Sequence, residues 1–140
     1  MLPSPPPCPE NLAGLLAADR FGRLAGIELV AVEPGRATAR LRLTPTHWNG
    51  VGITHGGALF TLADVAFAAA SNSRGRVAVA VQASVSFLKA TSEGTLTAEA
   101  REVACGHKLG TYVVEVKNEA GELVALFQGT AYRKSEALST

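Results

Sequence analysis

Residues 47–72 have the sequence HWNGVGITHGGALFTLADVAFAAASN, a glycine-rich loop followed by a long apolar run. The run predicts a helix from Ala58 to about Ser73, and Asp64 is its single ionisable residue. A helix that is apolar nearly all round is buried in a protein core rather than laid on a surface. We therefore expect the rest of the chain to wrap around this helix.

The loop before the helix contains two glycine-bearing groups, Asn49-Gly50 and His55-Gly56-Gly57. Glycines at the start of a helix let a ligand approach the backbone closely. The first amides of a helix have no partner within the helix, and the positive end of the helix dipole lies behind them. Such an amide suits the oxyanion that develops when a thioester is hydrolysed.

The segments around the helix show the two-residue alternation of strands in a sheet with one solvated face. Pro34-Gly35 is a turn dipeptide, so residues 27–33 and Arg36–Leu43 should form a hairpin. A short amphipathic helix is expected from Asn11 to near Gly26. An antiparallel sheet curled around one central helix satisfies these patterns and makes the chain an α+β protein. Further strands are predicted at residues 77–87, 95–103, 108–117 and 123–133.

Composition limits the class of protein. The chain has 140 residues, 47% hydrophobic and 18% charged, which suits one domain with a substantial core. A net charge of +1 leaves no strong field for nucleic acid or an anionic membrane. The proline-rich start does not resemble a signal peptide, and no stretch is apolar enough to span a membrane. We expect a cytoplasmic protein.

Three segments are expected: a proline-rich flexible tail at 1–10, a single domain at 11–135 and a C-terminal tail at 136–140. Cys8 and Cys105 are predicted to be free thiols in a reducing cytoplasm. They show no CxxC spacing, which argues against metal binding through cysteine. The three histidines do not have the spacing of metal ligands. We expect neither a metal nor a cofactor.

Residues 47–72 resemble the signature segment of phenylacetic-acid-degradation-type thioesterases, which belong to the hotdog superfamily. The resemblance continues through SVSFLKA at 84–90 and LVALFQGTAYR at 123–133, so it covers nearly everything after the tail. It implies a hotdog fold in which Asp64 is the catalytic carboxylate and the Gly56 amide polarises the thioester carbonyl. Asn49 would orient the water or the carbonyl, and His55 would position the thioester.

The same resemblance implies a small acyl-CoA substrate, with phenylacetyl-CoA and its ring-hydroxylated relatives as candidates. Gly57, Phe60, Phe67 and Lys89 are the predicted substrate-binding residues, with Leu62 and Trp48 as further candidates for the acyl pocket. This chain departs from related hotdog branches at Ala68, where those branches carry a hydroxyl one helical turn beyond the carboxylate. Ser71 and Asn72 are the nearest polar residues in its place. Candidates for contacts with the CoA phosphates are Arg74, Arg76, Lys89, Lys108 and Arg133.

Helix geometry adds a constraint that does not depend on the family. Gly56 and Asp64 are eight residues apart, which is about 12 Å along a helix with a rise of ~1.5 Å per residue. Both cannot touch one carbonyl, because reacting groups must lie within about 3 Å of it. The sequence therefore predicts a site shared between two antiparallel helices of a homodimer, and the family implies that dimers pair into tetramers.

Several functional alternatives remain open at this stage. Asp64 could act as a general base on water or as a nucleophile, or it could be a structural hydrogen-bonding residue. A hotdog hydratase or dehydratase and a non-catalytic acyl-CoA-binding module are the competing functions. In the predicted dimer the sole acid of the helix faces an oxyanion-type glycine, which favours hydrolysis over hydration. The presence of Asp64 argues against a non-catalytic module.

Overall fold

The computed structural model describes residues 2–4 and 10–139. The prediction for Cys8 and most of the predicted N-terminal tail lie outside these residues. Six strands form one antiparallel sheet in the order β1-β2-β4-β5-β6-β3. They are β1 (Ile27–Glu33), β2 (Arg36–Arg42), β3 (Arg76–Phe87), β4 (Thr95–Cys105), β5 (Leu109–Lys117) and β6 (Leu123–Ala137).

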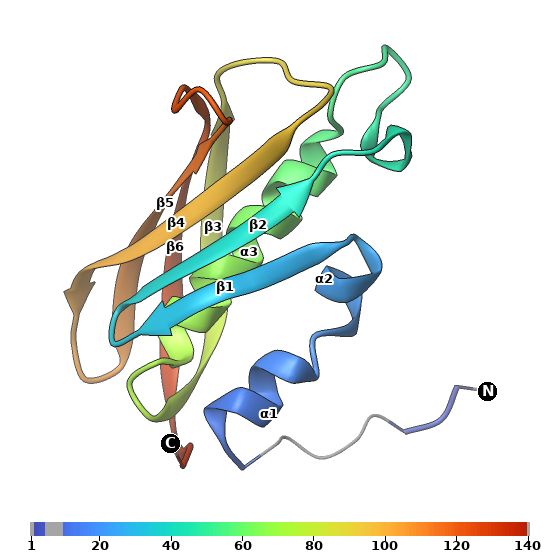
Figure 1. The fold of residues 1–140 in the computed structure, drawn as a ribbon. Helices are drawn as coiled ribbons and strands as arrows, with labels where there is room; N and C mark the ends of the chain where they lie inside the picture. Colours follow the sequence, from blue (N-terminus) through green and yellow to red (C-terminus); the bar gives the residue numbers. More distant parts are fainter. Residues whose placement is uncertain (1, 5–9, 140) are drawn as a thin grey trace.

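The central helix α3 (Gly56–Asn72) lies against this sheet and contacts all six strands (Figure 1). Leu62, Ala66 and Ala69 of the helix are fully buried, and they meet inward-facing strand residues such as Leu96 and Val114. This is the hotdog arrangement, and the α+β prediction is confirmed. The hairpin at Pro34-Gly35 is confirmed as well, since β1 and β2 pair antiparallel across it.

The N-terminal helix was predicted as one element and is two. Helix α1 (Leu12–Ala17) is capped by Asn11, and helix α2 (Arg20–Leu24) is capped by Asp19, whose Oδ1 accepts from the Gly22 amide at 2.9 Å. An aspartate that accepts from the amide three residues later begins a new helix and stops the old one. The prediction of one continuous helix is therefore wrong. The short 3-10 helix η1 (Pro45–His47) precedes the glycine-rich loop.

Strand β3 lies at the edge of the sheet, and its alternation is interrupted. Ala80 pairs with Ala131 and Gln82 with Thr130, so Val81 is an extra residue in a bulge. Ala83 and Val85 pack on the core beyond the bulge, whereas Val79 before it is 42% exposed. The predicted continuous alternation from residue 77 to 87 is therefore wrong on the N-terminal side of the bulge.

The last strand extends beyond the predicted domain end at 135. β6 continues to Ala137, Leu138 is buried, and the Leu138 amide donates to the Gly75 carbonyl at 2.7 Å. No helix within residues 2–4 and 10–139 is long and apolar enough to cross a membrane.

Candidate active site

Asn49 organises the loop that precedes α3. Its side-chain oxygen accepts from the backbone amides of Val51 and Ile53 at 3.0 and 3.2 Å, and its backbone amide donates to the Ile53 carbonyl at 2.8 Å. These bonds form the turn expected of Asn-Gly. The Asn49 oxygen is therefore occupied, and the Nδ2 amide is the part of the side chain left to donate to a ligand.

His55 is the N-cap of α3. Its Nδ1 accepts from the Gly57 amide at 2.8 Å, which requires the proton of the neutral ring to be on Nε2. The bond uses the Gly57 amide, so that amide is not free for a substrate. His55 is exposed, and its Nε2–H is the donor that it can offer to a ligand.

The Gly56 amide begins the helix and has no hydrogen-bond acceptor among the residues that the structure describes. The dipole of a 17-residue helix lies behind it. The ring of Phe87 lies close by, because a Cβ built on Gly56 would be 3.0 Å from Cζ of Phe87. A free amide in this position is suited to an oxyanion, as the sequence predicts.

Asn49 and Gly56 line one groove of about 430 Å³ together with Leu59, Phe87 and Lys89. Lys89 is the charged residue of this lining, and its Nζ forms a half-exposed ion pair with Glu122 at 3.1 Å. Three of the predicted site residues therefore meet in one place within a single chain.

Asp64 lies two turns further along α3 and does not line this groove. It shares the helix face opposite the core with Gly57, Thr61 and Ala68, none of which is buried. Its carboxylate is half-buried and accepts no hydrogen bond from any residue between 10 and 139. Burial raises the pKa of the Asp64 carboxyl, and the negative charge of Asp19 raises it further.

Asp19 was not singled out from the sequence. Its side chain was one polar group within a predicted helix, and nothing in the spacing indicated that α2 would bring it toward Asp64. Gly22 of α2 packs on Val65 of α3, since a Cβ at Gly22 would lie 3.0 Å from Val65 Cγ2. That contact brings the capping carboxylate of Asp19 to the region of Asp64.

None of the predicted aromatic and leucine residues lines this groove. Phe67 and Leu62 lie in the core, Phe60 packs against it, and Trp48 is 43% exposed. Phe67 is 2% exposed between Tyr112 and Phe127, and Phe60 is half-buried with its ring 5.4 Å from Phe127. Leu62 is fully buried. The Trp48 indole donates to the Ser92 carbonyl at 2.8 Å and so ties the loop to the β3–β4 connection.

Most of the predicted phosphate contacts are used within the fold. Arg74 forms two bonds of 3.1 Å with Glu102, while Arg76 and Arg133 donate to backbone carbonyls. Ser71 and Asn72 are buried and bonded to backbone groups, so neither replaces the missing hydroxyl at Ala68. Lys108 is exposed. In the described part of the chain, no three His, Cys, Asp or Glu side chains gather as metal ligands.

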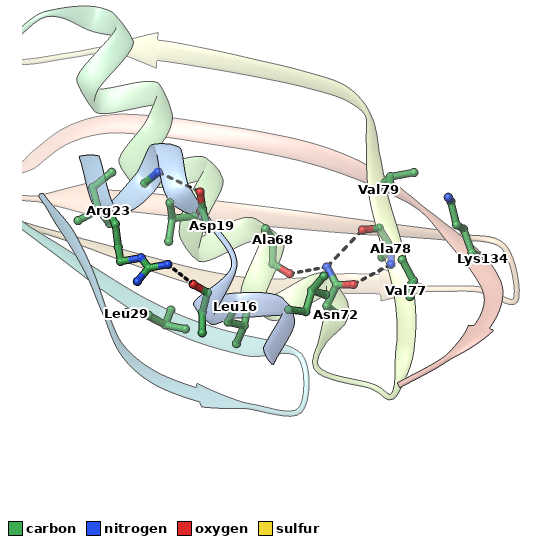
Figure 2. A pocket seen from close by; sticks show the side chains of 15 residues that line it. Leu16, Asp19, Arg23, Leu29, Ala68, Asn72, Val77, Ala78, Val79 and Lys134 are labelled. Carbon is green, nitrogen blue, oxygen red and sulfur yellow. Dashed lines mark hydrogen bonds between the residues drawn. The ribbon is translucent and has the colours of Figure 1, made fainter. Parts of the chain in front are cut away.

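A second cavity, of about 590 Å³, lies between α1–α2 and the part of α3 that follows Asp64 in the chain. Figure 2 shows its lining. Asp19, Val65 and Ala68 are among its lining residues. The sequence did not indicate this cavity, because it depends on how the two short helices pack.

The two roles of His55 can be separated by a pair of substitutions. His55→Ala removes the cap and should lower the free energy of unfolding by about 1 kcal/mol. His55→Asn keeps a capping oxygen and should restore most of that loss. We expect both variants to have a lower turnover than the native protein, because neither retains the Nε2–H donor. Thermal unfolding and steady-state rates measure the two effects, and an Asn variant with native activity would reduce His55 to a helix cap.

Comparison with known proteins gives consistent matches. Residues 51–125 match the family model described as Thioesterase superfamily. The acyl-coenzyme A thioesterase PaaI of Escherichia coli is 37% identical over 125 residues, which are 89% of each chain. The structure of the E. coli PaaI protein aligns with a TM-score of 0.87 at 35% identity, covering 92% of this chain and 94% of that one. The phenylacetic acid degradation protein PaaI from Thermus thermophilus aligns with a TM-score of 0.79 at 38% identity, covering 83% and 100%.

Proposed function

The chain belongs to the thioesterase superfamily and acts as an acyl-CoA thioesterase, and we propose that its active site forms between two subunits and takes small aromatic, phenylacetyl-type acyl groups. The observation that carries the proposal is a pair of unpartnered groups on one helix. The Gly56 amide lacks an acceptor and the Asp64 carboxylate lacks a donor in residues 10–139. A two-fold axis would bring the Gly56 amide of one chain and the Asp64 carboxylate of the other to the same thioester carbonyl.

Antiparallel pairing of two α3 helices meets the distance requirement. If the helices cross near residue 60, midway between the two groups, Gly56 of one chain lies level with Asp64 of the other. The helix face that would meet the partner has the small residues Gly57, Thr61 and Ala68. Thr61 is also compact, because its hydroxyl donates to the Gly57 carbonyl at 2.7 Å. Small side chains allow two helix backbones to approach closely.

The edge of β3 supports the same two-fold arrangement. β3 pairs with β6 on one side and with no described strand on the other. Its residues Val79 and Val81 are 42% and 58% exposed, so this unpaired edge carries apolar side chains that a second copy could cover. A second copy that pairs antiparallel with this edge would bring its Phe87 end, and with it the groove at Gly56, beside Val79 of the first copy.

Such a site can hydrolyse a thioester. Asp64 removes a proton from water that attacks the carbonyl carbon, or attacks that carbon itself to form an anhydride that water then cleaves. Gly56 N–H of the partner subunit donates to the developing oxyanion, and Asn49 Nδ2 orients the water or the carbonyl. His55 Nε2–H positions the thioester. The C–S bond breaks, and CoA leaves as the thiolate and takes up a proton.

A thiol-release assay with acetyl-CoA, octanoyl-CoA and phenylacetyl-CoA tests the function. We expect free CoA from phenylacetyl-CoA, the substrate class that the names of the PaaI relatives suggest. Binding of these ligands without thiol release would indicate an acyl-CoA-binding module. Loss of conjugation from an enoyl-CoA, again without thiol release, would indicate a hydratase.

Asp19 is expected to set the pH range of activity through Asp64. Asp64 must be ionised in either chemical route, so activity falls as pH drops through its raised pKa. Asp19→Asn keeps the helix cap and removes the negative charge, which lowers the pKa of Asp64. The acid limb of the kcat/KM profile should therefore move to lower pH. An unchanged limb would show that Asp64 and Asp19 are not coupled in the working enzyme.

A further inference from the structure

The larger cavity is lined by residues of α1, α2, α3, β1, the start of β3 and β6. In Figure 2, Leu16, Arg23 and Leu29 lie on one side of it, and Val77, Val79 and Lys134 lie on the other. Most of the lining is aliphatic, with Leu15, Leu16, Leu29, Val65 and Val77 among its members. At about 590 Å³ the cavity is in the size range of sites for small organic ligands.

The cavity lies beside Asp64. Val65 adjoins Asp64 in the chain, and Ala68 lies one turn further on the same helix face; both line the cavity. Asp19 lines it too, and its charge acts on Asp64. An acyl chain whose carbonyl lies at Asp64 would therefore find this cavity next to it, whereas the groove at Gly56 lies two turns away along the helix.

The polar groups of the lining are engaged with the protein. Asn72 bonds the Ala68 carbonyl at 2.8 Å and both backbone groups of Ala78 at 2.8 and 3.2 Å (Figure 2). Asp19 caps α2, and Arg23 donates to the Ala17 carbonyl. Lys134 of β6 also lines the cavity, and its Nζ lies 4.0 Å from a carboxylate oxygen of Glu136. The rest of the interior offers a ligand mainly aliphatic surface, which binds by removing apolar area from water.

We propose, building on the proposed function, that this cavity holds the acyl group of a thioester whose CoA portion lies in the Gly56 groove of the partner subunit. The acyl groups that fit are apolar to their far end, and Leu16 of α1 limits their size. The proposed antiparallel β3 pairing agrees with an acyl group in one chain and CoA on the other. Val77 and Val79 line the cavity and belong to the strand that would meet the partner's groove. One substrate then spans both chains.

Leu16→Trp tests the assignment by filling the cavity from α1. We expect kcat/KM for octanoyl-CoA and phenylacetyl-CoA to fall about tenfold or more, while acetyl-CoA, too short to reach Leu16, changes less than about twofold. Leu24→Trp is the matched control, because Leu24 lies in the adjacent helix and is 83% exposed. It should leave the ratio between the substrates unchanged.

Leu16→Ala provides the opposite change where the bulky variant fails to fold. It enlarges the cavity, and the ratio of kcat/KM for octanoyl-CoA to that for acetyl-CoA should rise about threefold or more. A ratio unchanged in every folded Leu16 variant would overturn the acyl assignment. If the variants instead alter the oligomeric state and slow all substrates equally, the cavity receives a segment of the partner chain and the assignment is also wrong. Failure of the native protein to release CoA from any substrate would count against the proposed function itself.

Discussion

Replacing Asp64 with asparagine should lower kcat for acyl-CoA hydrolysis by about a hundredfold or more. Asparagine keeps the size and shape of the side chain but has neither the charge nor the basicity that both routes require. The native carboxylate accepts no hydrogen bond from the described residues, so its loss leaves no donor unpaired in the monomer. Folding should therefore be preserved, and acyl-CoA binding should be largely kept.

Asp19→Asn is the matched control for this prediction. It makes the same chemical change at a carboxylate whose bond to the Gly22 amide an asparagine oxygen can replace. At a pH well above the acid limbs of both the native and the Asp19→Asn profiles, kcat of the Asp19 variant should stay close to the native value. An Asp64 variant with near-native turnover would remove Asp64 from the chemistry and leave it as a structural residue.

The central helix and the hairpin could be predicted because each carries a strong local signal. The run from Ala58 onward is apolar with a single acid, and Ala37, Ala39 and Leu41 alternate with polar residues. All three of those strand residues are buried, as period-two alternation predicts. The helix starts at Gly56, two residues before the predicted start, because the His55 side chain caps it.

Other features depend on contacts that no local pattern encodes. The bulge at Val81 follows from how β3 pairs with β6, and the apolar alternation of Val79, Val81, Ala83 and Val85 passes through it without interruption in the sequence. The break between α1 and α2 rests on Asp19, which also fits within a continuous amphipathic pattern. Strand pairing decided the first case, and the Asp19 cap, which the hydrophobic pattern does not encode, decided the second.

The candidate site shows the same division. Asn49, His55 and Gly56 were predicted from a loop whose bonds are local, and the structure brings Asn49 and Gly56 together in one groove. Phe60 and Phe67 could not be separated from ligand-facing residues, because an apolar helix gives no hydrophobic face by which to orient it. The cavity beside Asp64 involves α1, α2 and β1, which the sequence does not connect with α3.

Two inactive variants should restore activity when their subunits are mixed. Gly56→Pro removes the amide that would donate to the oxyanion, a loss expected to cost about a hundredfold to a thousandfold in kcat. Asp64→Asn removes the carboxylate. In a mixed dimer with shared sites, one site carries both lesions and the other carries neither. Random exchange makes about half of the dimers mixed, each with one intact site of two, so roughly a quarter of native activity should return.

The backbone at Gly56 is compatible with proline. Proline is favoured at the first position of a helix, and His55, at φ −61° and ψ 136°, has the extended conformation that a residue before proline adopts. The new side chain would contact Phe87, which is 55% exposed in the single chain. Gly56→Ala is the matched control, since it adds the same Cβ contact but keeps the amide and should retain far more activity than Gly56→Pro.

Subunit exchange is followed with differently tagged chains, and folding of each variant by circular dichroism. Once exchange is established, activity that rises above both parents in proportion to the mixed dimer supports a site built from two chains. If activity stays at the level of the parents, each site draws its carboxylate and its amide from a single chain. That outcome would contradict the shared site and the antiparallel pairing of α3, which was inferred because Gly56 and Asp64 of one chain are about 12 Å apart along the helix.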